Sequence, residues 1–417
     1  MVDIFVRMGR LLAARWPALL AWFLAGWLAR YLLIELAGQV GSVTAVGGFL
    51  LLPLAALARL LSYVAMFLVL RDEMPGYQRV LATGVPPVDL GASGRRRAAV
   101  DVTLACILPF FAFYAAWKLL RDDVIEYSLV ALDARVDDIF LGRDIAEGGI
   151  LDLRLSVVTG AIIVVAYLGR LVLKRAAGRL PKWTSLLAVY LEAVWVYFFV
   201  SIVGTYLTEF RGWVDTRQAM VWIAELRAGL AETVAPLAVA WDGVEWVIAE
   251  VSGLVLLPLA WLTLAGVILG RALARASGRP RLLPARLEVV QRTWSRVPGW
   301  LARRLRDVGA DWVGRWRPLA DALVLIWRAG PIGLGLYVLA YTLLLAAGGW
   351  IARLAALGIG PQEVGWWRAL DAPFLFVIAV IIEPLRIVLI AAAYDYCLEK
   401  LEQRRAQEQA ASADLSR

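Results

Sequence analysis

The stretch FLFVIAVIIEPLRIVLIAAAY, Phe374 to Tyr394, is long and apolar enough to cross a lipid bilayer as a helix. A helix needs ~20 apolar residues to span ~30 Å of hydrocarbon. The middle of this stretch nevertheless contains Glu383 and Arg386, at the depth where a charged side chain costs the most free energy. The stretch therefore predicts a membrane-spanning helix whose charged residues face protein or trapped water rather than lipid.

The rest of the chain has the same apolar character. Of the 417 residues, 61% are hydrophobic and 19% are charged, whereas soluble proteins contain ~25% charged residues. Apolar runs of spanning length recur along the sequence, which predicts an all-α fold: a polytopic membrane helix bundle of about eight transmembrane helices with interfacial amphipathic helices. We expect a single bundle over residues 1–398, with spans near 16–38, 44–70, 99–119, 154–174, 184–207, 251–270, 331–352 and 372–396.

The loops between these spans alternate in charge. Basic residues dominate the N-terminus and the segments 71–98, 170–182 and 271–330, whereas acidic residues outnumber basic ones in 118–152 and 209–250. Because basic loops stay on the cytoplasmic side, the pattern predicts cytoplasmic N- and C-termini and an even number of spans. Arginine greatly outnumbers lysine, which indicates codon bias in a GC-rich genome rather than a demand for phosphate binding. We expect the protein in a bacterial cytoplasmic (inner) membrane.

Three segments outside the spans have patterns of their own. Apolar and basic residues alternate at helical spacing in the inner segment 271–330, which predicts either helices lying in the membrane interface or a cytoplasmic hairpin packed on the bundle. The outer segment 209–250 is predicted to be helical. The polar tail 399–417 is predicted to continue the last helix for a turn or two and then to become disordered.

The same segments suggest the partners of the protein. The anionic headgroups of membrane lipids suit its basic inner face, and other proteins could dock on the segments 271–330 and 209–250. We expect no nucleic acid as a partner, although the net charge is +8, because basic loops are the ordinary topology signal of a membrane protein.

A small set of charged residues falls inside the predicted spans. Glu383 and Arg386 lie three positions apart and therefore share a helix face. Pro384 between them predicts a helix break, because proline lacks a backbone donor. Arg59 in the second span and Glu192 in the fifth lie at a similar depth. We expect these two carboxylates and two guanidinium groups to form an intramembrane network, which would be the polar site of the protein.

This network allows two interpretations. A structural clamp would fix the register of the helices, whereas a binding or proton-relay site would serve a transported or lipidic ligand, as intramembrane ionisable residues often do. A carboxylate paired with arginine favours the clamp, and an unpaired one beside a water-filled cavity favours the relay. Asp101 and Arg170 lie nearer the inner boundary, where their side chains can extend to the headgroups.

Sequence motifs for common enzyme chemistry are absent. The chain contains neither G-x-x-x-x-G-K-[ST] nor G-x-S-x-G, has no histidine, and has only two cysteines. We therefore expect no cofactor, no metal and no enzymatic activity. If the protein were a transferase acting on a lipid-linked substrate, the candidate residues would be acids of the outer segments: Asp122, Asp123, Asp137, Asp138 and Asp215.

The function that these patterns favour is binding or transport of a lipidic or small solute through the intramembrane polar site. The protein would then be a multi-pass inner-membrane protein of a bacterium. A non-catalytic scaffold or assembly partner in the cell envelope is the alternative, and a transferase acting on a lipid-linked substrate is third.

Overall fold

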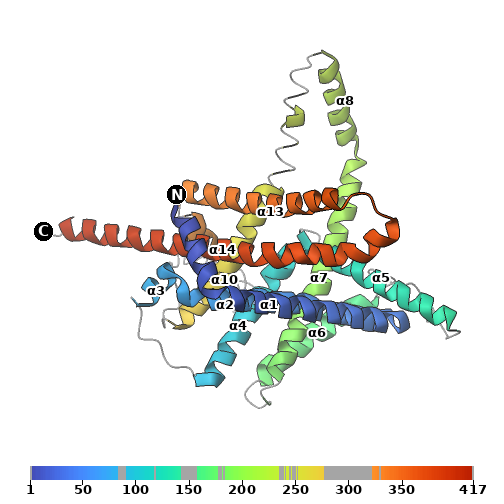
Figure 1. Ribbon diagram of the computed structural model, residues 1–417, viewed down its shortest axis with the longest axis horizontal. Coiled ribbons are helices and arrows are strands. Elements are labelled where there is room, and N and C mark those ends of the chain that lie inside the picture. The colour runs from blue at the N-terminus through green and yellow to red at the C-terminus, as the bar shows by residue number, and fades with distance from the viewer. Residues whose placement is uncertain are drawn as a thin grey trace, which may run out of the picture. The chain divides into compact units, whose positions relative to one another are not determined.

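The structure is a computed structural model, and helices account for its regular elements (Figure 1). It describes residues 2–82, 91–116, 119–141, 157–176, 181, 184–233, 239, 241–243, 246, 250, 252–276, 322–327 and 330–415. No β-strand occurs among these described residues. The predicted all-α fold is therefore confirmed.

The helices follow one another in the order that Figure 1 labels. Their bounds are α1 Val2–Val43, α2 Ala45–Leu70, α3 Pro75–Ala82, α4 Gly91–Ala116, α5 Leu119–Phe140, α6 Val157–Ala176, α7 Thr184–Asp215, α8 Gln218–Thr233, α10 Leu257–Ala276, α13 Pro331–Ile359 and α14 Val364–Leu415. A 3-10 turn, Arg71–Glu73, follows α2, and a π-helical turn, Ser252–Leu256, precedes α10.

Within the described part of the chain, six helices are long and apolar enough to cross a membrane. They cover Asp3–Val43, Ala45–Glu73, Thr184–Asp215, Gly253–Leu273, Pro331–Ile359 and Ala369–Arg404. Each overlaps one of the predicted spans, and helices of this kind are those of a membrane protein. A count of eight spans is not confirmed.

Among the described residues, the third and fourth predicted spans are not single helices long and apolar enough to cross a membrane. The third corresponds to a bent pair of helices in α4 and α5, which adds a seventh span only if the pair crosses as one. The fourth corresponds to α6, whose last two turns contain Arg170, Lys174 and Arg175. The part of α6 before Arg170 is shorter than the ~20 residues that a full span requires.

The chain divides into two compact units. Unit 1 consists of Met1–Leu28, Ala58–Pro109 and Trp261–Arg417, and unit 2 of Ala29–Leu57 and Phe110–Ala260. Some helices, α1 and α2 among them, contribute one part to each unit. The single bundle expected over residues 1–398 stays a prediction.

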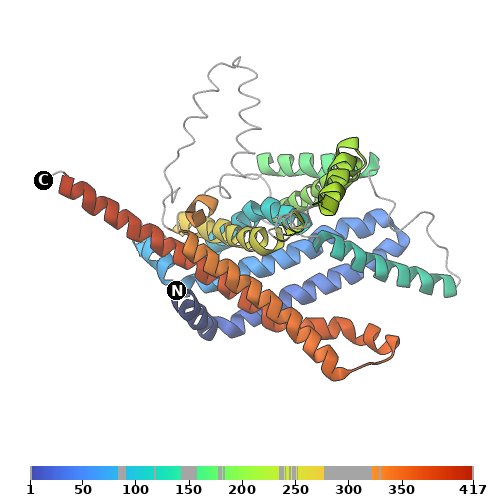
Figure 2. The ribbon, with the colours of Figure 1, turned by 90° about the horizontal axis from the view of Figure 1, so that it is seen from above.

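In unit 1, α13 and α14 pack side by side as a helical hairpin (Figure 2). Gly330, with φ +100°, precedes α13, and Gly360, with φ +79°, ends it. Residues with a Cβ rarely adopt these left-handed conformations, so glycine is needed at both positions. Pro331 suits the first helical position, where the N–H that it lacks would have no partner in the helix. These residues set the length of α13 and allow the chain to turn back.

α14 differs from the sequence-based expectation in two ways. It passes through Pro384 without ending, so the break predicted there does not interrupt the helix. The structural effect of this proline is the loss of one backbone hydrogen bond. α14 also continues to Leu415, well beyond the turn or two expected of the tail 399–417. The tail is rich in glutamate, glutamine, arginine and alanine, which are strong helix formers and explain the extension.

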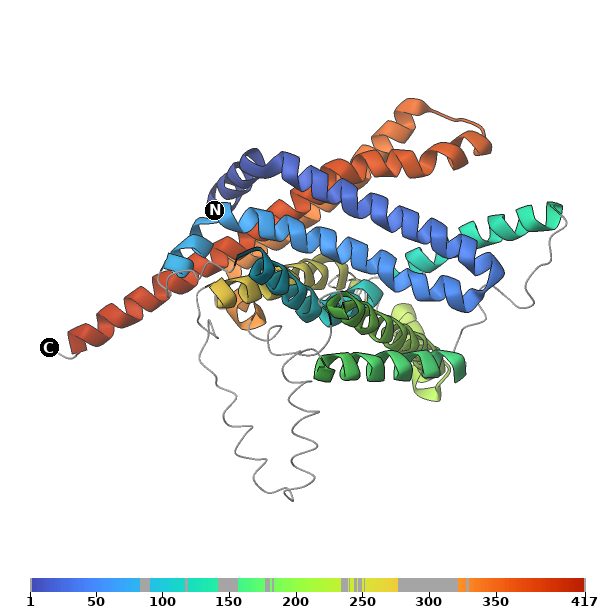
Figure 3. The ribbon, with the colours of Figure 1, turned by 90° about the horizontal axis from the view of Figure 1, so that it is seen from below.

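Glycines allow other helices of unit 1 to approach α14 closely. A Cβ at Gly266 of α10 would lie 3.3 Å from the ring of Tyr394, and one at Gly348 of α13 would lie 3.2 Å from the side chain of Ile382. The short helix α3 also packs against α14 (Figure 3). These contacts place α3, α10 and α13 against α14.

In unit 2, α6 and α7 pack against each other (Figure 3). The core of this unit is aromatic: the ring centroids of Phe111 and Tyr197 are 5.9 Å apart in an edge-to-face arrangement, and those of Phe110 and Tyr114 are 5.1 Å apart. α7 extends to Asp215 and α8 follows within the predicted outer segment. Most of the inner segment 271–330 lies outside the described residues, so its amphipathic helices stay a prediction.

Candidate functional site

Three of the four residues of the expected network lie in unit 1. Glu383 and Arg386 are on α14 and Arg59 is on α2, whereas Glu192 is on α7 in unit 2. Glu383 and Arg386 are in direct contact, because one helical turn separates them on the same face. The network of all four residues stays a prediction.

Arg386 is the centre of the polar cluster in unit 1. Its Nη2 atom is 2.5 Å from Oε2 of Glu383 and donates a hydrogen bond of 3.2 Å to the Tyr63 hydroxyl. The same hydroxyl donates to Oε2 of Glu383 at 3.3 Å. One carboxylate oxygen, one phenol and one guanidinium nitrogen thus form a closed triangle, in which the carboxylate is held by both neighbours.

Aromatic rings cover the guanidinium group. The Arg386 Cζ atom lies 4.4 Å from the ring centroid of Trp261 and 5.8 Å from that of Tyr63. The two rings are perpendicular, with centroids 5.1 Å apart. Attraction between a cation and the face of an aromatic ring is strongest where water is excluded, and only 9% of the Arg386 surface is exposed. The rings therefore stabilise a positive charge at a depth where it would otherwise be costly.

Arg59 belongs to the same cluster through Tyr63, with which its side chain shares a hydrogen bond. Its charge also acts on Arg386. The cluster as described thus combines the two guanidinium groups of Arg59 and Arg386 with the carboxylate of Glu383.

Two buried polar atoms of the cluster have no hydrogen-bond partner: Nε of Arg386 and the hydroxyl oxygen of Tyr341. Tyr341 lies on α13, is 1% exposed, and is close enough to Arg386 for the two side chains to interact electrostatically. Buried polar groups in folded proteins nearly always have partners, so an Nε atom that no acceptor contacts requires an explanation.

Glu192 has a different partner in unit 2. It forms an ion pair with Arg170 of α6, and both side chains are largely buried. The position of Arg170 near the inner boundary suggests that its side chain extends to the headgroups. In the structure it pairs with Glu192 instead. Because α6 and α7 pack against each other, this pair joins two neighbouring helices, and its stabilising effect depends on both charges being present.

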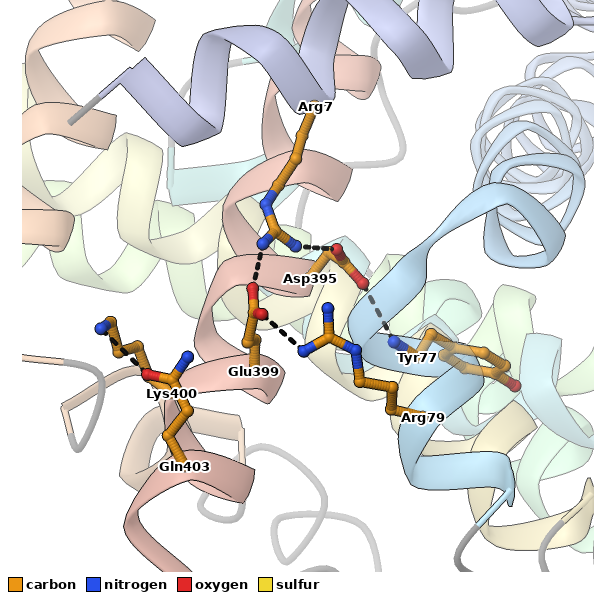
Figure 4. Close-up of polar contacts among 7 residues, drawn as sticks. All are labelled: Arg7, Tyr77, Arg79, Asp395, Glu399, Lys400 and Gln403. Atoms are coloured by element: carbon orange, nitrogen blue, oxygen red, sulfur yellow. Dashed lines mark hydrogen bonds and ion pairs between the residues drawn. The ribbon is translucent and has the colours of Figure 1, made fainter.

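A second polar cluster in unit 1, not expected from the sequence, surrounds Asp395 of α14 (Figure 4). The Asp395 carboxylate pairs with Arg7 of α1 and accepts a hydrogen bond of 3.0 Å from the backbone N–H of Tyr77 in α3. Glu399, one turn further along α14, pairs with Arg7 and accepts from Nη1 of Arg79 at 2.5 Å. These ion pairs connect α1, α3 and α14.

The cluster around Asp395 has the features of a structural joint. Asp395 is fully buried, and its partners are a guanidinium group and a backbone donor at the first turn of α3, where helix N–H groups lack partners of their own. The neighbouring Tyr77 hydroxyl is buried without a partner, and burial raises the pKa of Tyr77 to about 12. The sequence offers one signal for this joint. Asp395 is a lone aspartate between apolar residues, which indicates a buried carboxylate with a specific partner.

Unit 2 contains a third buried cluster. Nε and Nη2 of Arg30 lie 3.1 and 2.5 Å from Oδ1 of Asp123, and the Tyr114 hydroxyl donates to Oδ2 at 2.5 Å. Asp123 is 1% exposed, so it is not the solvated outer carboxylate that the transferase hypothesis requires. Glu126 also pairs with Arg30 at 2.6 Å, but it is partly exposed.

Unit 1 contains a cavity of about 310 Å³. It is lined by Gly330, Pro331, Ile332, Gly333, Tyr396, Lys400, Gln403, Arg404 and Gln407. Lys400 and Arg404 make its α14 side basic. Among the described residues, no group of three or more histidine, cysteine, aspartate or glutamate side chains could hold a metal ion.

Comparison of the chain with protein-family models, with curated proteins and with solved structures gave no match. The geometry of these clusters is therefore the basis for any statement about function.

Proposed function

We propose that this chain is a non-catalytic, multi-pass protein of a bacterial cytoplasmic membrane that binds or transports a lipidic or small solute at the polar cluster around Arg386. Both termini would be cytoplasmic, and the basic lining near Lys400 and Arg404 would contact anionic headgroups at the inner face. The proposal assigns no enzymatic step to the protein.

The observation that supports this proposal most is the unsatisfied Nε of Arg386. A buried charged donor without an acceptor is unfavourable unless something else compensates. The aromatic rings of Tyr63 and Trp261 stabilise the face of the guanidinium group, but they supply no acceptor in its plane. A cluster made only to hold helices together would be expected to satisfy its own charged donors.

A second candidate function, a scaffold or assembly partner in the cell envelope, is favoured by a different observation. Glu383 is held by both Arg386 and Tyr63, which is the arrangement expected of a clamp. The long helical continuation of α14 to Leu415 also offers a surface for another protein. Under this alternative the cluster would have no ligand.

Mass spectrometry of the intact protein, purified with its native lipids, distinguishes these candidates. The informative variant is the double substitution Glu383→Gln, Arg386→Met, which removes both charges together and so avoids leaving one of them buried alone. Arg353→Met is a matched control, because Arg353 is an exposed arginine of α13 in the same unit. The wild type and the control should retain a bound molecule that the double variant loses.

The opposite result is equally clear. If all three proteins, equally folded by circular dichroism, retain the same set of molecules, the cluster binds no ligand and the scaffold becomes the better candidate.

A further inference from the structure

One edge of an arginine side chain is suited to binding a carboxylate or phosphate. Nε–H and Nη2–H point in the same direction along this edge, and together they match the spacing of two oxygens of an oxyanion. How fully an edge of this kind is occupied therefore shows whether an arginine can accept a further anion.

Two other arginines of this chain provide an internal comparison. In unit 2, Nε and Nη2 of Arg30 both contact Oδ1 of Asp123, at 3.1 and 2.5 Å. In unit 1, Nε and Nη2 of Arg15 both contact Oε1 of Glu73, at 3.1 and 2.8 Å. In both pairs the carboxylate occupies the whole edge.

Arg386 differs from both. Glu383 contacts only its Nη2, through a single oxygen, and Nε is buried without a partner. Glu383 lies one turn away from Arg386 on the same helix, whereas the partners of Arg30 and Arg15 are distant in the sequence. The edge of Arg386 is thus half occupied, and its open half is buried.

Tyr341 supplies a second donor at the same place. Its hydroxyl is buried and has no acceptor of its own, and it lies within hydrogen-bonding reach of the Arg386 side chain. A phenol can donate one hydrogen bond to an acceptor that the arginine also contacts. The Tyr341 hydroxyl of α13 and the guanidinium group of Arg386 in α14 therefore lie beside each other, and each has a hydrogen to donate.

We propose that Nε of Arg386 and the hydroxyl of Tyr341 bind an oxyanion, a carboxylate or phosphate group, of the solute. This inference rests on the proposed function and names the chemical class of its ligand. The permanent positive charge of the Arg386 guanidinium group fits an anion and disfavours a cation.

Glu383 then has a defined role as an internal competitor. Its carboxylate occupies Nη2 and repels a second anion at the same guanidinium group. Glutamine at this position keeps an oxygen acceptor for Tyr63 and Arg386 but removes the negative charge. Glu383→Gln should therefore tighten anion binding, whereas loss of either donor should weaken it.

A pair of probes with the same chain tests the class of ligand. Oleate and oleyl alcohol differ only in the presence of the carboxylate, and their affinities for the purified full-length protein in nanodiscs can be measured by displacement of a fluorescent fatty acid. The wild type should bind oleate at least tenfold more tightly than oleyl alcohol. Phosphatidic acid and inorganic phosphate, tested in the same way, distinguish a lipid headgroup from a free anion, because inorganic phosphate should compete only in the second case.

Conservative substitutions test the roles of Tyr341 and Glu383 in anion binding. Tyr341→Phe should weaken oleate binding about tenfold, the effect of one lost hydrogen bond, and Glu383→Gln should strengthen it. Tyr197→Phe is the matched control, because it also removes a buried hydroxyl without a partner, but in unit 2. It should leave oleate affinity unchanged.

The possible failures are distinguishable. If oleyl alcohol binds as well as oleate, or if Tyr341→Phe and Glu383→Gln behave like Tyr197→Phe, the oxyanion inference is wrong, although the cluster can still bind a solute. If the wild type binds none of the probes and also retains no molecule in mass spectrometry, the inference and the proposed function are both wrong.

Discussion

Asp395 and Tyr77, 318 positions apart in the sequence, are joined by a hydrogen bond of 3.0 Å from the Tyr77 backbone N–H to Oδ1 of the carboxylate (Figure 4). Tyr77 lies in the first turn of α3, so Asp395 satisfies a helix N-terminus from a different helix. The same carboxylate pairs with Arg7. One buried side chain thereby links three segments of unit 1.

Replacing Asp395 should strongly destabilise unit 1. Asp395→Ala removes the acceptor of Tyr77 and the partner of Arg7, and should reduce the free energy of unfolding by about 3–5 kcal/mol. Asp395→Asn keeps an oxygen for the Tyr77 N–H and should have a smaller effect. The unfolding midpoints of both variants can be measured in mixed micelles of mild detergent and SDS.

Asp371 provides the control for this experiment. It is an exposed acid on the same helix, so Asp371→Ala should change the free energy of unfolding by less than about 0.5 kcal/mol. Equal effects of Asp395→Ala and Asp371→Ala would show that the Asp395 joint does not stabilise the protein.

Close packing at Gly76 gives an independent test of the same joint. A Cβ at Gly76 would lie 2.6 Å from the backbone oxygen of Asp395, a distance that requires α3 or α14 to move. Gly76→Ala should therefore cost about 1–3 kcal/mol. Gly9→Ala is the matched control, because no atom lies within 4 Å of a Cβ there and alanine favours the helix. Thermal unfolding should show a lower midpoint for Gly76→Ala alone.

The apolar helices of this fold could be predicted from the sequence, because the length of an apolar run is a local property. The run beginning at Thr184 and the one beginning at Pro331 start at the predicted residues. The contact between Glu383 and Arg386 is local too, since a spacing of three residues in a helix places both side chains on one face.

The distant partners could not be predicted in this way. Arg7 and Asp395 are 388 positions apart, and Arg30 and Asp123 are 93 apart. Which charges meet depends on which helices pack together, and local patterns such as apolar length and residue spacing do not reveal that packing. The sequence alone therefore groups Asp123 with the solvated acids of its segment, and it does not indicate that Glu192 pairs with Arg170.

The pair of Arg30 and Asp123 should show strong coupling. Either Arg30→Met or Asp123→Leu leaves a charge buried without its main partner and should cost about 3–5 kcal/mol. The double variant leaves neither charge and should cost less than the sum of the single effects by about 1–3 kcal/mol. A double-mutant cycle of unfolding free energies measures this coupling. Glu126→Gln, at the partly exposed partner of Arg30, should cost less than about 1 kcal/mol.

Additive single effects would contradict this prediction. They would mean that the guanidinium group and the carboxylate do not stabilise each other, and that Tyr114, which donates to Oδ2 of Asp123, satisfies the carboxylate by itself.

Tyr77 should make the stability of the protein sensitive to alkaline pH. Its pKa is raised to about 12 by burial, compared with about 10 in an unfolded chain. Between these values the unfolded phenol is ionised while the folded one keeps its proton, so unfolding releases a proton and becomes more favourable as pH rises. The wild type should therefore lose stability from pH 10 towards pH 12 relative to Tyr77→Phe.

The same variant should also be more stable at neutral pH. The Tyr77 hydroxyl is buried without a hydrogen-bond partner, and removing such a group should stabilise the folded state by about 1 kcal/mol. Unfolding midpoints at pH 8 and pH 11 separate the two effects, because the stabilisation is present at both and the titration only at the higher pH. A wild type and Tyr77→Phe that differ equally at both values would show that Tyr77 ionises in the folded protein as readily as in the unfolded chain.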